Sequence, residues 1–192
     1  MEPAIQTSLR RMLRMYLEQD PDYHRAARLA KDNSRGGLWL IGGSVFRTLA
    51  YFMYGTPMKQ KIDHDFMVDS MPESFTHPGW TFTQNRYGNP KFVYKDSVVD
   101  LVPISRASSV VRRKVEPTIE NFLDGAPFTI QKIALNCLDW RLVDRGGIAA
   151  LMKQEVRVND PAEADLLSQK KGRPIFEIML QLAVELQFKI VK

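Results

Sequence analysis

The amino-acid sequence predicts an α+β fold, in which helices pack on a small mixed β-sheet and a short helical segment follows. Three patterns indicate this class. Apolar residues recur at helical spacing over 5–17. A short apolar run over 38–41 ends at a glycine pair and precedes a second helical pattern. An alternating pattern over 62–68 is typical of a strand with one buried face. An α/β arrangement of the same elements is the alternative.

Turn residues and periodicity predict the remaining elements. A helix is expected over 21–32, where Pro21 suits the first helical position, and a loop over 33–37. Ser44 is expected to cap the helix after the glycine pair. Further on, the patterns predict strands at 80–85, 91–94 and 97–104, a mobile basic loop at 105–116, a short helix at 118–123, a hairpin of 128–138 and 141–144, a helix opened by Gly146-Gly147, and helices within 161–187 that break near 172–174. The elements divide into a head domain over 1–160 and a short helical, neck-like segment over 161–192.

The composition is that of an ordinary globular protein that favours anionic partners. Hydrophobic residues make up 44% of the 192 residues, and no apolar run approaches the roughly 20 residues of a membrane span. The net charge of +5 favours nucleotides or nucleic acids. A single cysteine, Cys137, excludes an internal disulfide, and the first residues do not resemble a secretory signal. A cytoplasmic location without a membrane partner is therefore expected.

Two aspartates on the strand predicted over 62–68 are candidate catalytic metal ligands. Side chains two positions apart on a strand point to the same face, so Asp63 and Asp65 are expected side by side. Such carboxylates repel unless a cation lies between them, and their hard oxygens suit Mg²⁺. Asp100, within the apolar run 98–102, is expected to add a third carboxylate from a neighbouring strand. This set suits two Mg²⁺ ions that clamp the attacking and leaving oxygens of a phosphoryl transfer.

The residues around the glycine pair are candidate phosphate ligands. Gly42 and Gly43 allow close approach of the backbone, and the following helix offers free N–H groups and the positive end of its dipole. The Ser44 hydroxyl is expected to hold phosphate as well. Arg47, near the helix start, and Lys61, just before the aspartates, are the candidate cations. The expected ligand is a nucleoside triphosphate (NTP).

Other polar residues have weaker functional signals. His64 alternates away from the two aspartates and is expected in the core. The cluster Arg112-Arg113-Lys114 is expected either to be solvated or to contact phosphates. The spacing of histidine and cysteine is not that of a zinc site.

At these motifs the chain resembles the polymerase-beta-like nucleotidyltransferase superfamily, and within it the head domain of bacterial-type poly(A) polymerases and CCA-adding tRNA nucleotidyltransferases. The segments that carry the resemblance are Leu40-Ile-Gly-Gly-Ser-Val45, Ile62-Asp-His-Asp-Phe-Met67 and Val99-Asp-Leu-Val102. A looser likeness extends over about 37–190. The resemblance implies the nucleotidyltransferase fold, two Mg²⁺ ions, and transfer of a nucleotide from an NTP to a hydroxyl, with an RNA 3′ end as the expected acceptor. It implies that Asp63 and Asp65 bind both ions and that Asp100 completes the one that activates the hydroxyl.

The sequence departs from the family pattern in the parts that read the sugar, the base and the tRNA. Residues 46–48 replace the family's Arg-Asp after the valine, and 125–127 replace its Arg-Arg-Asp. Glu177 and Gln181 lie where CCA-adding enzymes choose the base, and no long helical body follows. A full CCA-adding enzyme is therefore not expected. The alternatives are a transferase that modifies a protein or a small molecule, an inactive nucleotide- or RNA-binding module, and an antitoxin-like partner protein.

Overall fold

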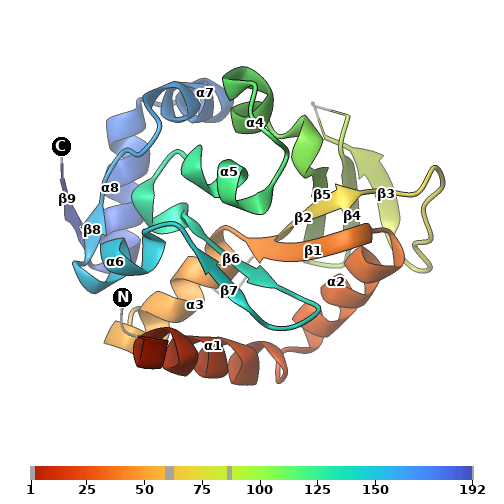
Figure 1. Ribbon diagram of the computed structural model, residues 1–192, viewed down its shortest axis with the longest axis horizontal. Helices are drawn as coiled ribbons and strands as arrows, with labels where there is room; N and C mark the ends of the chain where they lie inside the picture. The colour runs from red at the N-terminus through yellow and green to blue at the C-terminus, as the bar shows by residue number, and fades with distance from the viewer. Residues whose placement is uncertain (1–2, 59–62, 86–87, 192) are drawn as a thin grey trace.

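A computed structural model describes residues 3–58, 63–85 and 88–191 and builds them around a seven-stranded sheet (Figure 1). The strands lie in the order β3-β4-β5-β2-β1-β6-β7. Neighbours are antiparallel except β2 and β5, which are parallel, so the sheet is mixed as predicted. The bounds of its strands are β1 (Arg35–Ile41), β2 (His64–Ser70), β3 (Thr81–Gln84), β4 (Pro90–Tyr94), β5 (Ser97–Pro103), β6 (Ile133–Asn136) and β7 (Leu142–Asp144).

Helices surround the sheet, and a second, two-stranded parallel pair lies beside it. That pair consists of β8 (Glu155–Val156) and β9 (Lys189–Ile190). The helices are α1 (Pro3–Leu17), α2 (Pro21–Asp32), α3 (Gly43–Tyr54), η1 (Ile104–Arg106), α4 (Ser108–Arg113), α5 (Ile119–Asp124), η2 (Thr129–Gln131), α6 (Gly147–Met152), α7 (Pro161–Lys171) and α8 (Ile175–Leu186).

The two faces of the sheet have different cores. Helices α1, α2 and α3 bury one face, where Leu40 and Phe66 are fully enclosed. Helices α4 and α5 cover part of the opposite face, where Trp39 and Met67 pack with Leu123. Because side chains alternate along a strand, Asp65 lies on the face of Met67 and not on that of Phe66. The sheet therefore directs Asp65 toward the less covered side.

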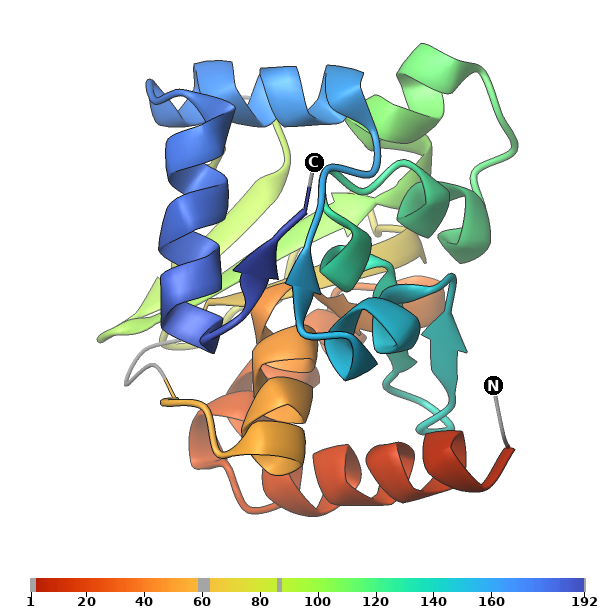
Figure 2. The same cartoon turned by 90° about the vertical axis from the view of Figure 1, so that its left-hand side faces the viewer.

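Helices α7 and α8 border the less covered side of the sheet, to which Asp65 points (Figure 2). Helix α8 buries Leu182 and Leu186 in the same core as α3, and Arg47 of α3 forms an ion pair of 2.5 Å with Glu185 of α8. Helix α7 is held to α4, because Ser108 donates a hydrogen bond of 2.7 Å to Glu163. None of the helices in the described residues is long and apolar enough to cross a membrane.

Most predicted elements are present, and four details are wrong. Residues 35–37 belong to β1 and not to a loop, and 129–131 form η2 before the predicted hairpin. The strand with the aspartates begins at His64, so Asp63 precedes it. Segment 105–116 is no mobile loop: it contains α4, in which Ser109 and Val110 are buried.

Candidate active site

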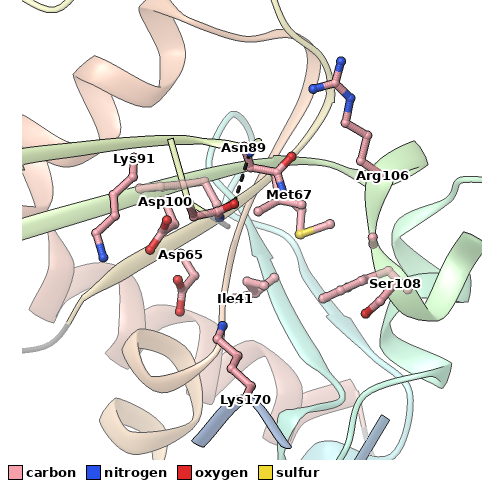
Figure 3. Close-up of a pocket in the computed structure, with 14 residues that line it drawn as sticks. Ile41, Asp65, Met67, Asn89, Lys91, Asp100, Arg106, Ser108 and Lys170 are labelled. Carbon is pink, nitrogen blue, oxygen red and sulfur yellow. Dashed lines mark hydrogen bonds between the residues drawn. The ribbon is translucent and has the colours of Figure 1, made fainter. Parts of the chain in front are cut away.

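A row of four side chains crosses the sheet and forms the centre of the site. The strand registers pair Lys91 of β4 with Asp100 of β5, Asp100 with Asp65 of β2, and Asp65 with Ile41 of β1. Neighbouring strands lie about 4.8 Å apart, so the two carboxylates are adjacent on one face. Figure 3 shows Asp65 and Asp100 side by side, with Lys91 beside them. The predicted pairing of Asp65 with an aspartate on a neighbouring strand is therefore present.

This row lies in a cavity of about 380 Å³, which we call the row cavity. Besides the row itself, its lining includes apolar side chains from the strands and α5, two amides, and the cations Arg106 and Lys170. In Figure 3, Lys170 points toward Asp65 from below, and Arg106 lies on the opposite side of the cavity. The row cavity thus brings an acidic pair and three basic side chains together.

A second cavity, of about 550 Å³, meets the first at Asp65. It is lined by Gly42 and Gly43, by Asp63 and Asp65, and by residues of α7 and α8, and we call it the glycine cavity. Its basic side chains are Arg47, Lys171 and Arg173. The N-terminus of α3 borders it, and the first N–H groups of a helix have no partner within the helix. The glycine cavity is therefore suited to an anion of several charges.

A hydrogen-bonded chain closes one side of the glycine cavity. Arg173 donates to Gln181 (2.7 Å), and Gln181 donates to Glu185 (2.8 Å). Glu185 in turn pairs with Arg47. Arg47 lines the cavity and is held by a carboxylate of α8, and its contact with phosphate stays a prediction. The other predicted cation, Lys61, lies outside the described residues.

Ser44 has a structural role in place of the predicted cap and phosphate contact. The cap of α3 is Gly42, and Ser44 is 2% exposed. Its hydroxyl donates to the carbonyl oxygen of Asp63 (3.0 Å) and lies 3.2 Å from Nδ1 of His64. Because the one hydroxyl proton is used on Asp63, we assign the proton of the second bond to Nδ1 of His64. Ser44 thus fixes the backbone where β2 begins.

His64 is buried, as predicted. Its burial lowers the pKa of the imidazole, which the nearby Asp20, Asp22 and Asp63 carboxylates only partly offset. The neutral ring can donate from Nδ1 to Ser44 without leaving a buried charge. His64 is therefore part of the support of the site and does not line either cavity.

The pKa of Asp65 is raised to about 7. Burial is the largest cause, followed by the carboxylates of Asp100 and Asp63, while Lys170 and Lys91 lower the pKa. A pKa raised in this way means that a second negative charge in the row is unfavourable without a cation. One carboxylate oxygen of Asp100, Oδ1, is buried and finds no hydrogen-bond partner among the described residues. Both observations fit a divalent cation at this pair.

The three predicted metal ligands do not converge on a common point. Across the part of the chain that the structure describes, no three His, Cys, Asp or Glu side chains are grouped closely enough to hold one metal ion. The exposed Asp63 lines the glycine cavity, Asp100 lines the row cavity, and Asp65 lines both. The arrangement is two pairs that share Asp65. Mg²⁺ is often held by one or two carboxylates, with substrate phosphates and water completing its shell, so each pair has a suitable set of donors.

Several residues of the site had no signal in the sequence. Lys91 joins the row only through the register of β4 against β5, and Lys170 and Lys171 reach the cavities from α7. Arg112 and Arg113 were expected either to be solvated or to contact phosphates, and in the structure both side chains form bonds within the protein. Arg112 bonds Asp160 and Glu163, and Arg113 donates to the carbonyl of Ser109.

The support by Ser44 can be tested through stability. Ser44→Ala removes the bond to Asp63 and leaves the buried Nδ1 of His64 without a partner, so we expect a loss of about 1–3 kcal/mol in the free energy of unfolding. Chemical denaturation measures it. Ser34→Ala is the control, because within the described residues the Ser34 hydroxyl donates only an exposed hydrogen bond, to the carbonyl of Lys31. Equal, small losses in both variants would contradict the role of Ser44.

Comparison with solved structures identifies the fold. The chain is similar to the CCA-adding enzyme of Bacillus stearothermophilus in complex with CTP, with a TM-score of 0.58 and 17% identity over 90% of this chain and 42% of that one. It is also similar to a tRNA nucleotidyltransferase complexed with a primer tRNA and an incoming ATP analog (TM-score 0.53, 20% identity, 81% of this chain and 44% of that one). A third similar structure is an apo form of a tRNA-processing enzyme, with a TM-score of 0.54 and 16% identity over all of this chain and 45% of that one.

These likenesses show that the chain has the nucleotidyltransferase fold, as the motifs predicted. The chain spans less than half the length of these three structures. No protein-family model matches the chain, and no curated protein matches it.

Proposed function

We propose that this chain is a metal-dependent nucleotidyltransferase that moves a nucleoside monophosphate from an NTP to a hydroxyl. The observation that carries the proposal is the position of Asp65. It is in register with Asp100 in the row cavity, and it also lines the glycine cavity with Asp63. A carboxylate shared by two adjoining cavities is the arrangement that a transfer between two bound substrates needs, because both reacting groups must meet at one point.

The NTP binds in the glycine cavity. Its triphosphate lies against the start of α3, where Gly42 and Gly43 line the cavity without a side chain in the way. The helix dipole and the basic side chains of Arg47, Lys171 and Arg173 offset its negative charge. Cavities of this size suit a ligand as large as a nucleotide. The solved structures with CTP and with an ATP analog support an NTP as the ligand class.

Two Mg²⁺ ions would be held by the two carboxylate pairs. Asp63 and Asp65 would hold the ion on the triphosphate, and Asp65 and Asp100 the ion beside the acceptor hydroxyl. Bound Mg²⁺ polarises the phosphoryl oxygens and lowers the pKa of the hydroxyl. In the protein alone, Lys91 and Lys170 provide part of the positive charge that the Asp65–Asp100 pair needs.

During the transfer, one residue of the row can accept the proton of the hydroxyl, and the basic side chains of the glycine cavity can stabilise the charge of the leaving group. The acceptor oxygen forms a bond to the α-phosphorus of the NTP, and the bond from that phosphorus to the bridging oxygen breaks. Pyrophosphate leaves with the electron pair, close to Arg47, Lys171 and Arg173. The hydroxyl proton passes to Asp100, whose Oδ1 has no partner among the described residues. The protein therefore catalyses the transfer mainly by positioning the two substrates and by stabilising the charge of the transition state.

The acceptor that we favour is an RNA 3′ end. The complex of the tRNA nucleotidyltransferase with a primer tRNA supports this choice, and so does the net charge of +5. A protein or a small-molecule hydroxyl is the alternative acceptor on the same site.

Incubation with each labelled NTP, Mg²⁺ and total cellular RNA tests the proposal. We expect one or more NTPs to label RNA, with release of pyrophosphate, and Asp63→Asn to remove both signals. If no NTP is turned over with RNA, protein or small hydroxyl acceptors, the enzyme proposal is wrong. NTP binding without turnover would then indicate an inactive module, and a stoichiometric co-purifying protein would indicate an antitoxin-like partner.

A further inference from the structure

Helix α8 places a carboxylate in the cavity that the proposed function assigns to the triphosphate. Glu185 lines the glycine cavity together with the basic side chains of Arg47, Lys171 and Arg173. Only 22% of the Glu185 side chain is exposed, so water screens its charge little. A carboxylate repels a polyphosphate that binds beside it. Glu185 therefore weakens the binding of the anion that the other side chains of the cavity attract.

The same carboxylate lies at an unfavourable place in its own helix. Helix α8 ends at Leu186, so Glu185 is in its last turn, which contains no basic residue. The C-terminal end of a helix carries a partial negative charge, and an acidic side chain there costs stability. The helix is anchored without it, because Leu182 and Leu186 are buried in the main core. A neutral side chain would suit the helix better, so stability alone does not account for Glu185.

We infer that Glu185 is a positioning residue that competes with phosphate for Arg47 and so promotes the release of pyrophosphate after transfer. The inference rests on the proposed function, because it assigns a regulatory role within the same site. Arg47 donates to the phosphates while the NTP is bound, and it returns to Glu185 when pyrophosphate leaves. The intact NTP has the nucleoside and the α-phosphate as further contacts, and pyrophosphate has lost both. The competition therefore acts most strongly on the residence time of the product.

The contacts of Arg47 suit such an exchange of partners. Its Nη1 lies 2.5 Å from Oε2 of Glu185, in an ion pair at the edge of the cavity. Its guanidinium carbon lies 5.3 Å from the centre of the ring of Phe46, which lines the same cavity. The guanidinium has five N–H donors, and its position over the ring is favourable whichever anion it pairs with. Arg47 can therefore change partners without leaving the cavity.

The hydrogen-bonded chain along α8 supports the carboxylate when Arg47 leaves it. Gln181 donates to Glu185 (2.8 Å) and accepts from Arg173 (2.7 Å). A partly buried carboxylate without any donor would be costly, and the amide of Gln181 removes part of that cost. The chain thus holds Glu185 at the cavity in both states, ready to take Arg47 back.

Calorimetric titration with pyrophosphate and Mg²⁺ tests the inference without any turnover. We expect Glu185→Gln to lower the Kd for pyrophosphate at least about 5-fold, because the competing charge is gone. A purely structural role of the ion pair predicts the opposite sign, since a loosened α8 would weaken binding. Glu185→Asp keeps the charge, and its Kd should lie closer to that of the wild type than to that of Glu185→Gln.

Glu155→Gln is the matched control for the loss of an ion pair. Glu155 pairs with Lys189 at 3.2 Å in the small sheet next to α8, and it lines neither cavity. Its replacement should leave the Kd for pyrophosphate unchanged. Thermal denaturation should show that Glu185→Gln is folded and melts no lower than Glu155→Gln. In the transfer assay, Glu185→Gln should lower the KM for NTP and should not raise kcat, because the product leaves more slowly.

The inference is overturned if Glu185→Gln raises the Kd for pyrophosphate or leaves it unchanged, if Glu185→Asp gains as much affinity as Glu185→Gln, or if no form of the protein binds pyrophosphate. The transfer assay on the same samples shows which proposal has failed. Turnover of NTP with no gain in affinity in Glu185→Gln would remove the role of Glu185 and keep the transferase. A gain in affinity with no turnover of any NTP would remove the transferase and leave a polyphosphate site in which Glu185 competes for Arg47.

Discussion

Replacing Asp65 by asparagine will abolish nucleotide transfer and make the metal-free protein more stable at pH 8. Asp65 lines both cavities, and in the proposed mechanism it would bind both ions, so its loss should reduce turnover at least about 10³-fold. The gain in stability has a separate cause, because burial and the neighbouring carboxylates raise the Asp65 pKa to about 7. Asparagine has nearly the same shape and no charge. Pyrophosphate release and chemical denaturation in EDTA measure the two effects.

The pH dependence of the stability difference follows from the same shift. Below pH 3.8 the Asp65 carboxyl is neutral in both the folded and the unfolded state, and it costs the fold no stability. As pH rises from 3.8 to 7, the carboxyl ionises more readily in the unfolded state, so the free energy of unfolding falls, and the loss is complete above pH 7. The free energy of unfolding of the asparagine variant should therefore exceed that of the wild type by on the order of 4 kcal/mol at pH 8, and the difference should vanish near pH 4.

Asp165→Asn is the matched control, since Asp165 is an exposed carboxylate of α7 that lines neither cavity. It should change neither turnover nor the pH profile. Wild-type turnover in Asp65→Asn would contradict the site, and a stability gain independent of pH would contradict the electrostatic cause.

Gly42→Ala is expected to weaken both NTP binding and the fold. Gly42 has φ +68° and ψ −144°, a region that is accessible almost only to glycine. A Cβ at this position would lie 3.2 Å from Oδ2 of Asp65 and would face the glycine cavity. We expect the free energy of unfolding to fall by about 1–3 kcal/mol. We expect the Kd for NTP to rise at least about 10-fold, as measured by calorimetry.

Gly55→Ala separates the backbone effect from the site. Gly55 also has a positive φ, of +67°, and a Cβ there would meet nothing within 4 Å. Its replacement should cost about 1 kcal/mol of stability and leave the NTP affinity unchanged. If Gly55→Ala weakens NTP binding as much as Gly42→Ala does, the glycine pair has no direct part in binding.

The order of helices and strands was predictable where local signals agree. Pro21 begins α2 after the capping Asp20, and Thr118 caps α5. The turn at Gly42 ends β1 and begins α3. These residues act on the backbone next to them, so their effect does not depend on the rest of the fold.

The wrong predictions concern residues whose partners are distant in the sequence. Arg112 suggested a solvated or nucleic-acid-binding loop, but its partners are Asp160 and Glu163, about fifty residues later. Ser44 suggested a helix cap, but its hydroxyl bonds the backbone of Asp63 and contacts His64. A sequence pattern shows the kind of group at a position, and it does not show which partner the fold brings to it.

The sequence by itself determined the type of fold and indicated which residue types gather at the candidate site. The apolar periodicity specifies helices and strands, and two glycines followed by alternating aspartates can be recognised without neighbours in space. Only the tertiary structure decided how the charges are grouped. The register of β4, β5 and β2 places Lys91, Asp100 and Asp65 in one row, and the packing of α7 adds Lys170. The physical reason is that register and helix packing depend on the burial of the entire core, to which residues throughout the chain contribute.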